Sequence, residues 1–515
     1  MISVDYTGLE YNFCSLLAAK TLIMRQRFEQ QMRISTVAIS DVKFPLKSRD
    51  ELPPVLKALQ HIFITPQLNE KVFTLLEEKI CKGKKKTGRK GMDLWHLLVL
   101  AVIRHTLDTN WDRLHDTANY HELVRSIMGV HGSTFYDEKI EFNYQNILDN
   151  VSLLDEKLLE KINDVVVESG HQLVKKKEEE VISLKTDSYA LETNVHFPTD
   201  LNLLWDSLRK CLDVVKELKE QCGLKGWRKI KHLRSDLKSQ FRKTSHQVFK
   251  GKKEDQKKQS VKQYLNRAND MLSRFESIIN NPPLNANDPE MVIILVVELK
   301  RYVEFVKKIS EQIERRLIKG EAIPAAEKIY SIFEEHTEWI SKGKLNKKVE
   351  LGHLLLITTD QHHFIVDYKI MEKQKDATQV KDLQQRIDEK YKGKVIYSHS
   401  FDKGFWSKDN LQTLQESKTE YVVLPKRGKL NKEEKEREST KTFKKLRHAH
   451  SAVESNINML GHHGLNRCFD KGIKGFKRCV GLSILAYNLH QLGNALLAKE
   501  REQARRKQKA LAKAA

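Results

Sequence analysis

Apolar residues recur every three or four positions over most of the first 130 residues, a period that predicts amphipathic helices. The clearest runs lie at 52–63, 69–80 and 92–107. Two shorter helical runs at 111–120 and 121–129 are close enough for a helix-turn-helix, although small helical domains often contain such pairs without touching DNA. We expect residues 1–175 to form a helical N-terminal domain, with DNA-end binding as a candidate role.

A different pattern begins near residue 176, where a short run of β-branched and apolar residues ends in polar ones, as in a strand. Helical periodicity returns over 201–345, with the Asn- and Pro-rich segment 280–289 as its one clear breaker. Further strand-like and helical runs follow, with strands at 353–359, 362–370, 394–400 and 420–426 and helices at 376–391 and 441–498. This alternation indicates a mixed α/β fold whose sheet is split by a helical insertion.

The same order divides the chain into five parts. They are the helical N-terminal domain 1–175, a first strand region 176–200, a basic helical insertion 201–345, the remainder of the α/β core 346–497 and a basic C-terminal tail 498–515. Tails rich in Ala, Lys and Arg are frequently frayed helices. Nonspecific contact with phosphates is therefore the most that we expect of the tail.

Charge points to the class of partner. The 515 residues carry a net charge of +22, with an isoelectric point near 9.4, and such a surface attracts polyanions before any specific contact forms. Segment 221–275 holds sixteen Lys and Arg against four Asp and Glu, and Trp227, Phe241 and Phe249 lie among the cations. This mixture favours contact with a phosphate backbone, and its alternative is a solvated helix face beside a lysine-rich loop.

We take the cations of this segment as candidate DNA contacts. They are Lys225, Arg228, Lys229, Lys231, Arg234, Arg242, Lys243, Lys252 and Lys253.

Other features narrow the location. No apolar stretch approaches the roughly 20 residues that span a bilayer, and the N-terminus lacks the basic start of a secretory signal. The six cysteines include no Cys-x-x-Cys pair and no zinc-like spacing. We expect a cytoplasmic, nucleoid-associated protein with reduced thiols.

Three carboxylates are the candidates for chemistry, since the sequence has no P-loop, zinc motif or nucleophile elbow. Asp187 closes the first predicted strand, Asp402 follows the strand-like run that ends near 400, and Glu454 lies in a helix-forming run. Carboxylates at two strand ends and on a crossing helix can hold two magnesium ions, which prefer hard oxygen ligands, and such a site cuts phosphodiesters. Each residue also has a simpler interpretation, as a turn cap, the start of a loop and a solvated helical side chain.

A resemblance favours the catalytic interpretation. The stretch DSYALETNVHFPTDLNLLWDS resembles the block around the first catalytic Asp of insertion-sequence DDE transposases, in particular the ISNCY group. FDKGFWSKDN resembles the block around the second Asp of that group, and RHAHSAVESNINMLGHHGLNRC with the residues up to 493 resembles the block holding its Glu. The stretches 87–129 and 149–171 resemble its helical N-terminal region, so that the likeness extends in order from about residue 40 to 497.

The resemblance implies an RNase H-like catalytic core in which Asp187, Asp402 and Glu454 match the DDE positions and hold two Mg²⁺ ions, with Mn²⁺ as a substitute. The implied reaction is cleavage at the ends of an insertion sequence, which exposes a 3′-hydroxyl, followed by attack of that hydroxyl on target DNA. The implied partner is double-stranded DNA, as terminal inverted repeats and as target. A dimer on DNA is likewise an expectation from the resemblance.

One departure concerns the surroundings of the last acid. Related transposases carry a Tyr, Arg, Glu, Lys signature there, but here Arg447 and His450 stand at the Tyr-like and Arg-like positions and Gly461 at the Lys-like one. His450 precedes Glu454 by one helical turn, so on a continuous helix the two share a face. Arg447, His450 and Lys403 are additional candidate DNA contacts, and a surface histidine is the alternative for His450.

Three rival functions stay open at this stage. They are a metal-dependent nuclease that cuts without joining strands, a catalytically inactive DNA-binding protein derived from a transposase, and a basic RNA-associated protein. The presence of all three acids argues against the second, and the three ordered carboxylate blocks argue against the third.

Overall fold

A computed structural model describes residues 25–30, 37–82, 91–130, 140–174, 181–283, 288–325, 327–341 and 349–514. The extreme N-terminus, Cys14 and most of the lysine-rich segment after Cys81 lie outside these ranges. The chain divides into two compact units, one formed by 1–192 with 353–515 and the other by 193–352. Each unit is described separately below.

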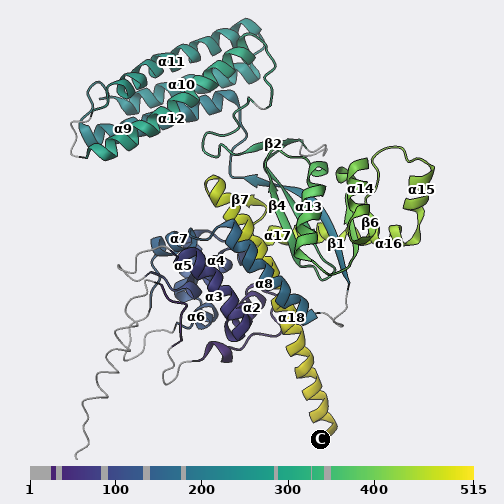
Figure 1. Cartoon of the computed structure of the whole chain (residues 1–515). Coiled ribbons are helices and arrows are strands. Elements are labelled where there is room, and N and C mark those ends of the chain that lie inside the picture. Colours follow the sequence, from purple (N-terminus) through teal and green to yellow (C-terminus); the bar gives the residue numbers. More distant parts are fainter. Residues whose placement is uncertain are drawn as a thin grey trace, which may run out of the picture. The chain divides into compact units, whose positions relative to one another are not determined.

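The first unit contains the N-terminal helices and the very long C-terminal helix. The elements are η2 (Ile39–Asp41), α2 (Leu52–Ile64), α3 (Pro66–Ile80), α4 (Leu94–Thr106), α5 (Trp111–Tyr120), α6 (Glu122–Met128), α7 (Tyr144–Val151), α8 (Glu156–Val174) and α18 (Gly472–Ala514). Helix α4 is buried along its whole length, and α18 packs against α2, α4 and α8 (Figure 1). The N-terminal helices therefore share one hydrophobic core with the C-terminal part of the chain.

Local signals explain where several of these helices begin and end. The side chains of Asn110 and Asn143 accept hydrogen bonds from the first turns of α5 and α7, which satisfies amide groups that have no partner within the helix. Gly129 ends α6 in the left-handed conformation (φ 68°) that favours glycine. His121 alone joins α5 to α6, a link shorter than the roughly 3–4-residue turn of a helix-turn-helix.

A mixed sheet forms the rest of the first unit. Its strands are β1 (Ile182–Thr193), β3 (Val349–Thr359), β4 (Ile365–Met371), β5 (Ile396–Phe401), β6 (Thr419–Val423) and the short β7 (Arg467–Cys468). The order across the sheet is β4-β3-β1-β5-β6. Strands β3 and β4 pair antiparallel. Strand β5 pairs parallel with β1 on one side and with β6 on the other. This arrangement is the expected RNase H-like core, and the mixed α/β fold class is confirmed.

Helices cover both faces of this sheet. The connecting elements are α13 (Asp376–Lys390), η4 (Lys403–Phe405), α14 (Lys408–Glu416), α15 (Lys432–Ser439), α16 (Lys441–His450) and α17 (Ala452–His462). Leu184 and Leu356 belong to the cluster that contains the apolar face of α13. Leu191 and Ile357 belong to the cluster formed with α17 and α18. Because alternate residues of a strand point to opposite faces, odd-numbered residues of β1 face α16, α17 and α18.

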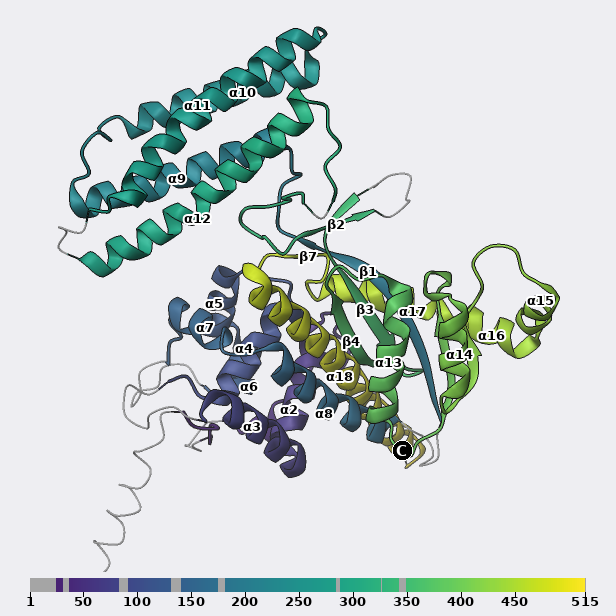
Figure 2. The same cartoon turned by 45° about the horizontal axis from the view of Figure 1, so that its top comes forward.

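The second unit is built on four helices that follow β1. They are α9 (Asp200–Cys222), α10 (Ile230–Lys250), α11 (Glu254–Asn280) and α12 (Pro289–Ile313), and both views show them lying side by side (Figure 2). They share a core of their own, which explains how so long an insertion folds between two strands of a sheet. A π-helical turn η3 (Glu314–Ile318) and the strand β2 (Glu338–Ser341), paired antiparallel with 349–352, complete the unit.

Two aromatic residues of the basic segment belong to this core. Trp227 is buried, stacks on Phe275 and lies under Arg274, while Phe241 is half-buried between Trp205 and Tyr264. Trp227 is therefore withdrawn from the mixture of rings and cations that favoured contact with a phosphate backbone, because its ring packs in the core of the helical bundle. Phe249 is 66% exposed. Within the described ranges, no helix combines the length and apolar character needed to cross a bilayer.

Candidate active site

The first two candidate acids meet on neighbouring strands. The parallel pairing of β1 with β5 ends at Thr186 and Phe401, so that Asp187 and Asp402 take the next position on each strand. Side chains that are level on adjacent parallel strands share a face, and adjacent strands lie about 4.8 Å apart. Asp187 and Asp402 therefore directly follow two residues that are level with each other, at the point where the pairing of β1 with β5 ends.

The position of Asp187 differs from the expectation that it closes its strand. Strand β1 continues for six residues beyond it, to Thr193, and is flanked by β3 on the side opposite β5. Asp402 directly follows the last residue of β5 and precedes the short turn η4, with an exposed side chain. Asp187, in the middle of β1, thus lies level with the carboxyl end of β5. A ligand can therefore approach Asp187 and Asp402 from the same end of the strands.

Glu454 comes from the helix that crosses this face. In this helix Val453 is fully buried, and Asn456 Oδ1 lies 3.1 Å from Nδ1 of His363 in the turn between β3 and β4. Glu454 itself is exposed in the first turn of α17. In the part of the chain that the structure describes, no three His, Cys, Asp or Glu side chains are grouped so as to hold a metal ion. The structure thus places Asp187 and Asp402 just beyond the last paired residues of neighbouring strands, and Glu454 on the covering helix, without a three-residue group among the described side chains.

His450 connects the same helical segment to β5. Its Nδ1 lies 3.0 Å from the Ser400 hydroxyl oxygen, and burial lowers the pKa of His450 to about 4, an effect that the charge of Asp402 opposes and that of Lys185 strengthens. His450 is therefore neutral at pH 7. The single helix expected through 450–454 is interrupted at Ser451, so the four-residue spacing does not place His450 and Glu454 on one continuous helical face.

Lys185 is a residue that the sequence did not single out. It lies two positions before Asp187 on the same face of β1, and burial lowers its pKa while the charge of Asp360 opposes this shift. Its charge also acts on His450, whose pKa it lowers further. A lysine on a strand otherwise rich in apolar residues was the available signal.

Asp376 was also missed. It opens α13, and its Oδ1 accepts a hydrogen bond of 2.7 Å from the Ser188 hydroxyl. A side chain added at Gly404 would meet Asp376 Oδ2 at 3.2 Å and Asp402 Oδ2 at 4.0 Å, so Asp376 lies at the same edge but on the face of α13. Its sequence signal was that of any acidic residue in the first turn of a helix.

A chain of buried hydrogen bonds supports the strands beneath the acids. Thr186 Oγ1 lies 2.8 Å from His399 Nε2 and 2.7 Å from Thr358 Oγ1, and these residues come from β1, β5 and β3. All three are fully buried. Burial lowers the pKa of His399 to about 3, so this imidazole is neutral at physiological pH. The network fixes the relative positions of β1 and β5 at the point where Asp187 and Asp402 follow.

The remaining candidate DNA contacts are mostly at the surface. Arg234 is half-buried and pairs with Asp213 at 2.7 Å. The cations with exposed side chains are Lys225, Arg228, Lys229, Lys231, Arg242, Lys243, Lys252, Lys253, Lys403 and Arg447. Arg447 also lines a pocket of about 330 Å³ with Lys444, His448 and Ser451.

Residues 322–489 match the family described as the transposase DDE domain. The matched segment covers about a third of the chain and contains Asp402 and Glu454, together with β3 to β6. No curated protein matches the chain, and no solved structure matches it. The match supports the assignment of this chain to a DDE transposase family, whose members are enzymes that cut DNA. It also agrees with the RNase H-like order of the strands.

Proposed function

We propose that the protein is a transposase that cuts the ends of an insertion sequence and joins them to target DNA. The observation that carries the proposal is that Asp187 and Asp402 each follow the last paired residue of β1 and β5, in a chain whose residues 322–489 match a transposase DDE domain. The resemblance of three ordered sequence blocks to the ISNCY group supports the same assignment.

The donor chemistry of the site fits divalent magnesium. Asp187, Asp402 and Glu454 offer only carboxylate oxygens, the hard ligands that Mg²⁺ prefers and Mn²⁺ also accepts. When bound, such ions supply Lewis-acid stabilisation of charge at the phosphodiester that is cut. Because the described side chains form no group of three, we propose that Glu454 joins the two aspartates when metal and DNA are present.

The surrounding residues have distinct tasks in this proposal. Lys185 places a positive charge on the face of the acids, which favours a DNA phosphate over other ligands. His450, neutral at pH 7, holds the end of α16 against β5 through Ser400. Asp376 and Ser188 fix the start of α13 beside the turn that follows Asp402.

Strand transfer separates the proposal from a nuclease that only cuts. The substrate is a labelled duplex carrying the element's end with its 3′-hydroxyl already exposed, mixed with unlabelled plasmid and magnesium. The proposal predicts label joined to the plasmid, and an Asp187→Asn variant should yield none. Efficient cutting of uncut ends without any joined product would favour the nuclease instead, whereas tight binding without either product would favour the inactive DNA-binding protein.

The basic insertion is proposed to supply affinity without base recognition. Replacing Lys252 and Lys253 by Gln should reduce the slope of log K against log salt for duplex DNA by about 2, because each phosphate contact contributes roughly 0.9. The measurement is fluorescence anisotropy with end and random duplexes between low and moderate salt.

A matched control uses two exposed lysines that lie outside the basic insertion, at the end of the sheet away from the candidate acids. Lys392 and Lys418 lie near the amino ends of β5 and β6, and their replacement by Gln removes the same charge. The control should leave the slope unchanged. Equal slopes for both double variants would contradict a role for Lys252 and Lys253 in DNA binding.

A further inference from the structure

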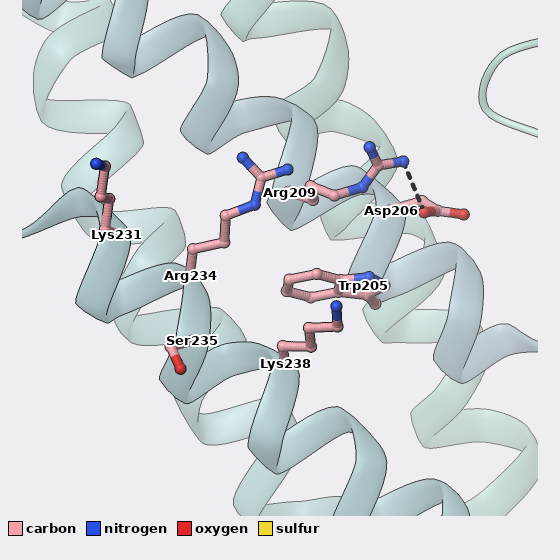
Figure 3. A pocket seen from close by; sticks show the side chains of 7 residues that line it. All are labelled: Trp205, Asp206, Arg209, Lys231, Arg234, Ser235 and Lys238. Atoms are coloured by element: carbon pink, nitrogen blue, oxygen red, sulfur yellow. Dashed lines mark hydrogen bonds and ion pairs between the residues drawn. The ribbon is translucent and has the colours of Figure 1, made fainter.

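A basic pocket lies between two helices of the insertion. It has a volume of about 510 Å³ and is lined from α9 by Trp205, Asp206 and Arg209 and from α10 by Lys231, Arg234, Ser235 and Lys238 (Figure 3). Residues three, four or seven apart share one face of a helix, and both helices turn such a face into the pocket. Four cations therefore converge on one concave surface against a single acid.

The single acid is already engaged. Asp206 is buried and pairs with Arg209 at 3.0 Å and with His196 at 2.7 Å, and Figure 3 shows Arg209 turned toward it. Asp213, outside the pocket, pairs with Arg234. Among the described residues Lys231 and Lys238 have no ion-pair partner, and both are exposed. Positive charge that its neighbours do not neutralise is the signature of an anion site.

Trp205 gives the pocket an aromatic wall. Its ring stacks on Phe241 of α10 with a centroid distance of 6.2 Å and an angle of 11° between the planes, and Phe241 in turn contacts Tyr264. This row of rings fixes the orientation of the indole, which is only partly buried. Lys238 extends toward the indole in Figure 3. Cations beside a partly exposed aromatic ring are the combination that binds unpaired nucleotides, through the phosphate and through stacking of the base.

We infer that this pocket binds one nucleotide of an unpaired DNA strand, with its phosphate among Arg209, Lys231, Arg234 and Lys238 and its base against Trp205. The volume lies within the range of about 300–1,000 Å³ typical of small-ligand sites, which suits a single nucleotide and excludes a duplex. The inference rests on the proposed action on DNA, since cutting and joining of strands generate unpaired nucleotides at the ends. It assigns a function to Trp205, Arg209 and Lys238, which the charge pattern alone did not select.

The test measures binding of a labelled 12-nucleotide single strand to the full chain by anisotropy, in buffer with EDTA so that no cleavage occurs. Trp205→Leu should weaken this binding about tenfold or more, because stacking contributes about 1–3 kcal/mol per base, and should change duplex binding little. Trp339→Leu is the matched control, since Trp339 is a partly exposed indole of the same unit. Trp205→Phe keeps a ring and should restore most of the affinity, which separates stacking from loss of folding.

The charge of the pocket has its own measurement. Lys231→Gln with Lys238→Gln should lower the salt slope for the single strand by about 1.4, because each phosphate contact to a single strand contributes roughly 0.7. Lys300→Gln with Lys308→Gln, two exposed lysines of α12, should leave it unchanged.

Two outcomes overturn the inference. In one, a variant of the pocket behaves like its control: either Trp205→Leu and Trp339→Leu bind the single strand alike, or the Lys231/Lys238 and Lys300/Lys308 double variants give the same salt slope. In the other, the wild type prefers a single-stranded RNA of the same sequence. Magnesium-dependent cleavage by the wild type is measured in parallel, so that normal cleavage with unaffected pocket variants refutes the pocket alone. A wild type that binds no DNA refutes the proposed function as well.

Discussion

Replacing Asp402 by Asn is expected to lower magnesium-dependent cleavage of end DNA by about a thousandfold or more. The substitution keeps the size of the side chain but removes the negative charge that a divalent ion requires of its ligand. A metal ligand contributes several kcal/mol of transition-state stabilisation, and each 1.36 kcal/mol that is lost slows the reaction about tenfold. The measurement is the rate of nicking of a labelled duplex under single-turnover conditions.

Binding of the same duplex should change less than about threefold, because Asp402 is one exposed acid in a chain of net charge +22. Asp409→Asn is the control, an exposed aspartate in the first turn of the next helix, α14. It should retain the cleavage rate of the wild type. Parallel loss of binding and cleavage in the Asp402 variant would contradict its assignment as a metal ligand.

Replacing Asp470 by Asn should lower the free energy of unfolding by about 3–5 kcal/mol, the usual result of breaking a buried ion pair. Asp470 accepts hydrogen bonds of 2.6 and 3.1 Å from the two terminal nitrogens of Arg104 in α4, and both side chains are nearly inaccessible. Arg104 also stacks on Trp111 at 4.0 Å. The substitution leaves a buried guanidinium without its counter-charge, which denaturant unfolding of the full chain measures.

The same pair predicts a dependence of stability on pH. Burial alone would raise the pKa of Asp470, but the hydrogen bonds and charge of Arg104 outweigh burial and hold the pKa below its ordinary value of 3.8. Because the pKa is lower in the folded state, this carboxylate stabilises the fold above about pH 4, and the contribution is lost as the pH falls through the folded-state pKa. The Asn variant should lack this component of acid sensitivity.

Glu502→Gln is the control for the Asp470 variant. Glu502 pairs with Arg506 on an exposed part of α18, and exposed pairs of this spacing contribute about 0.3–0.5 kcal/mol. A cost for Asp470→Asn as small as that of the control would show that the buried pair does not hold the N-terminal helices to the segment before α18.

The sequence predicted those features of the fold that depend on local periodicity. The helical run over 201–345 and the strands around 353–370 have distinct periods, so the split sheet could be anticipated. The packing of α18 against α2, α4 and α8 could not, because it depends on contacts between segments several hundred residues apart. The burial of Trp227 was missed for the same reason, since its partner Phe275 lies about 50 residues further on, in α11.

The candidate site shows the same limit. Asp187 and Asp402 were found because each stands at the end of a predicted strand, and the resemblance of their blocks to a known family supported both. The level placement of the two depends on the register of β1 with β5, which no local pattern encodes. The contact of Asp376 with Ser188 and the Trp205 pocket emerge only when residues from different elements are brought together.

The most direct test of the central claim is cleavage of a labelled duplex that carries the element's own end and flanking DNA, by the wild-type protein in magnesium and in calcium. Calcium supports binding but is usually inert in such sites. The account predicts nicking at the element boundary in magnesium, with binding but no nicking in calcium. Tight binding to the ends without nicking in magnesium or manganese would contradict it.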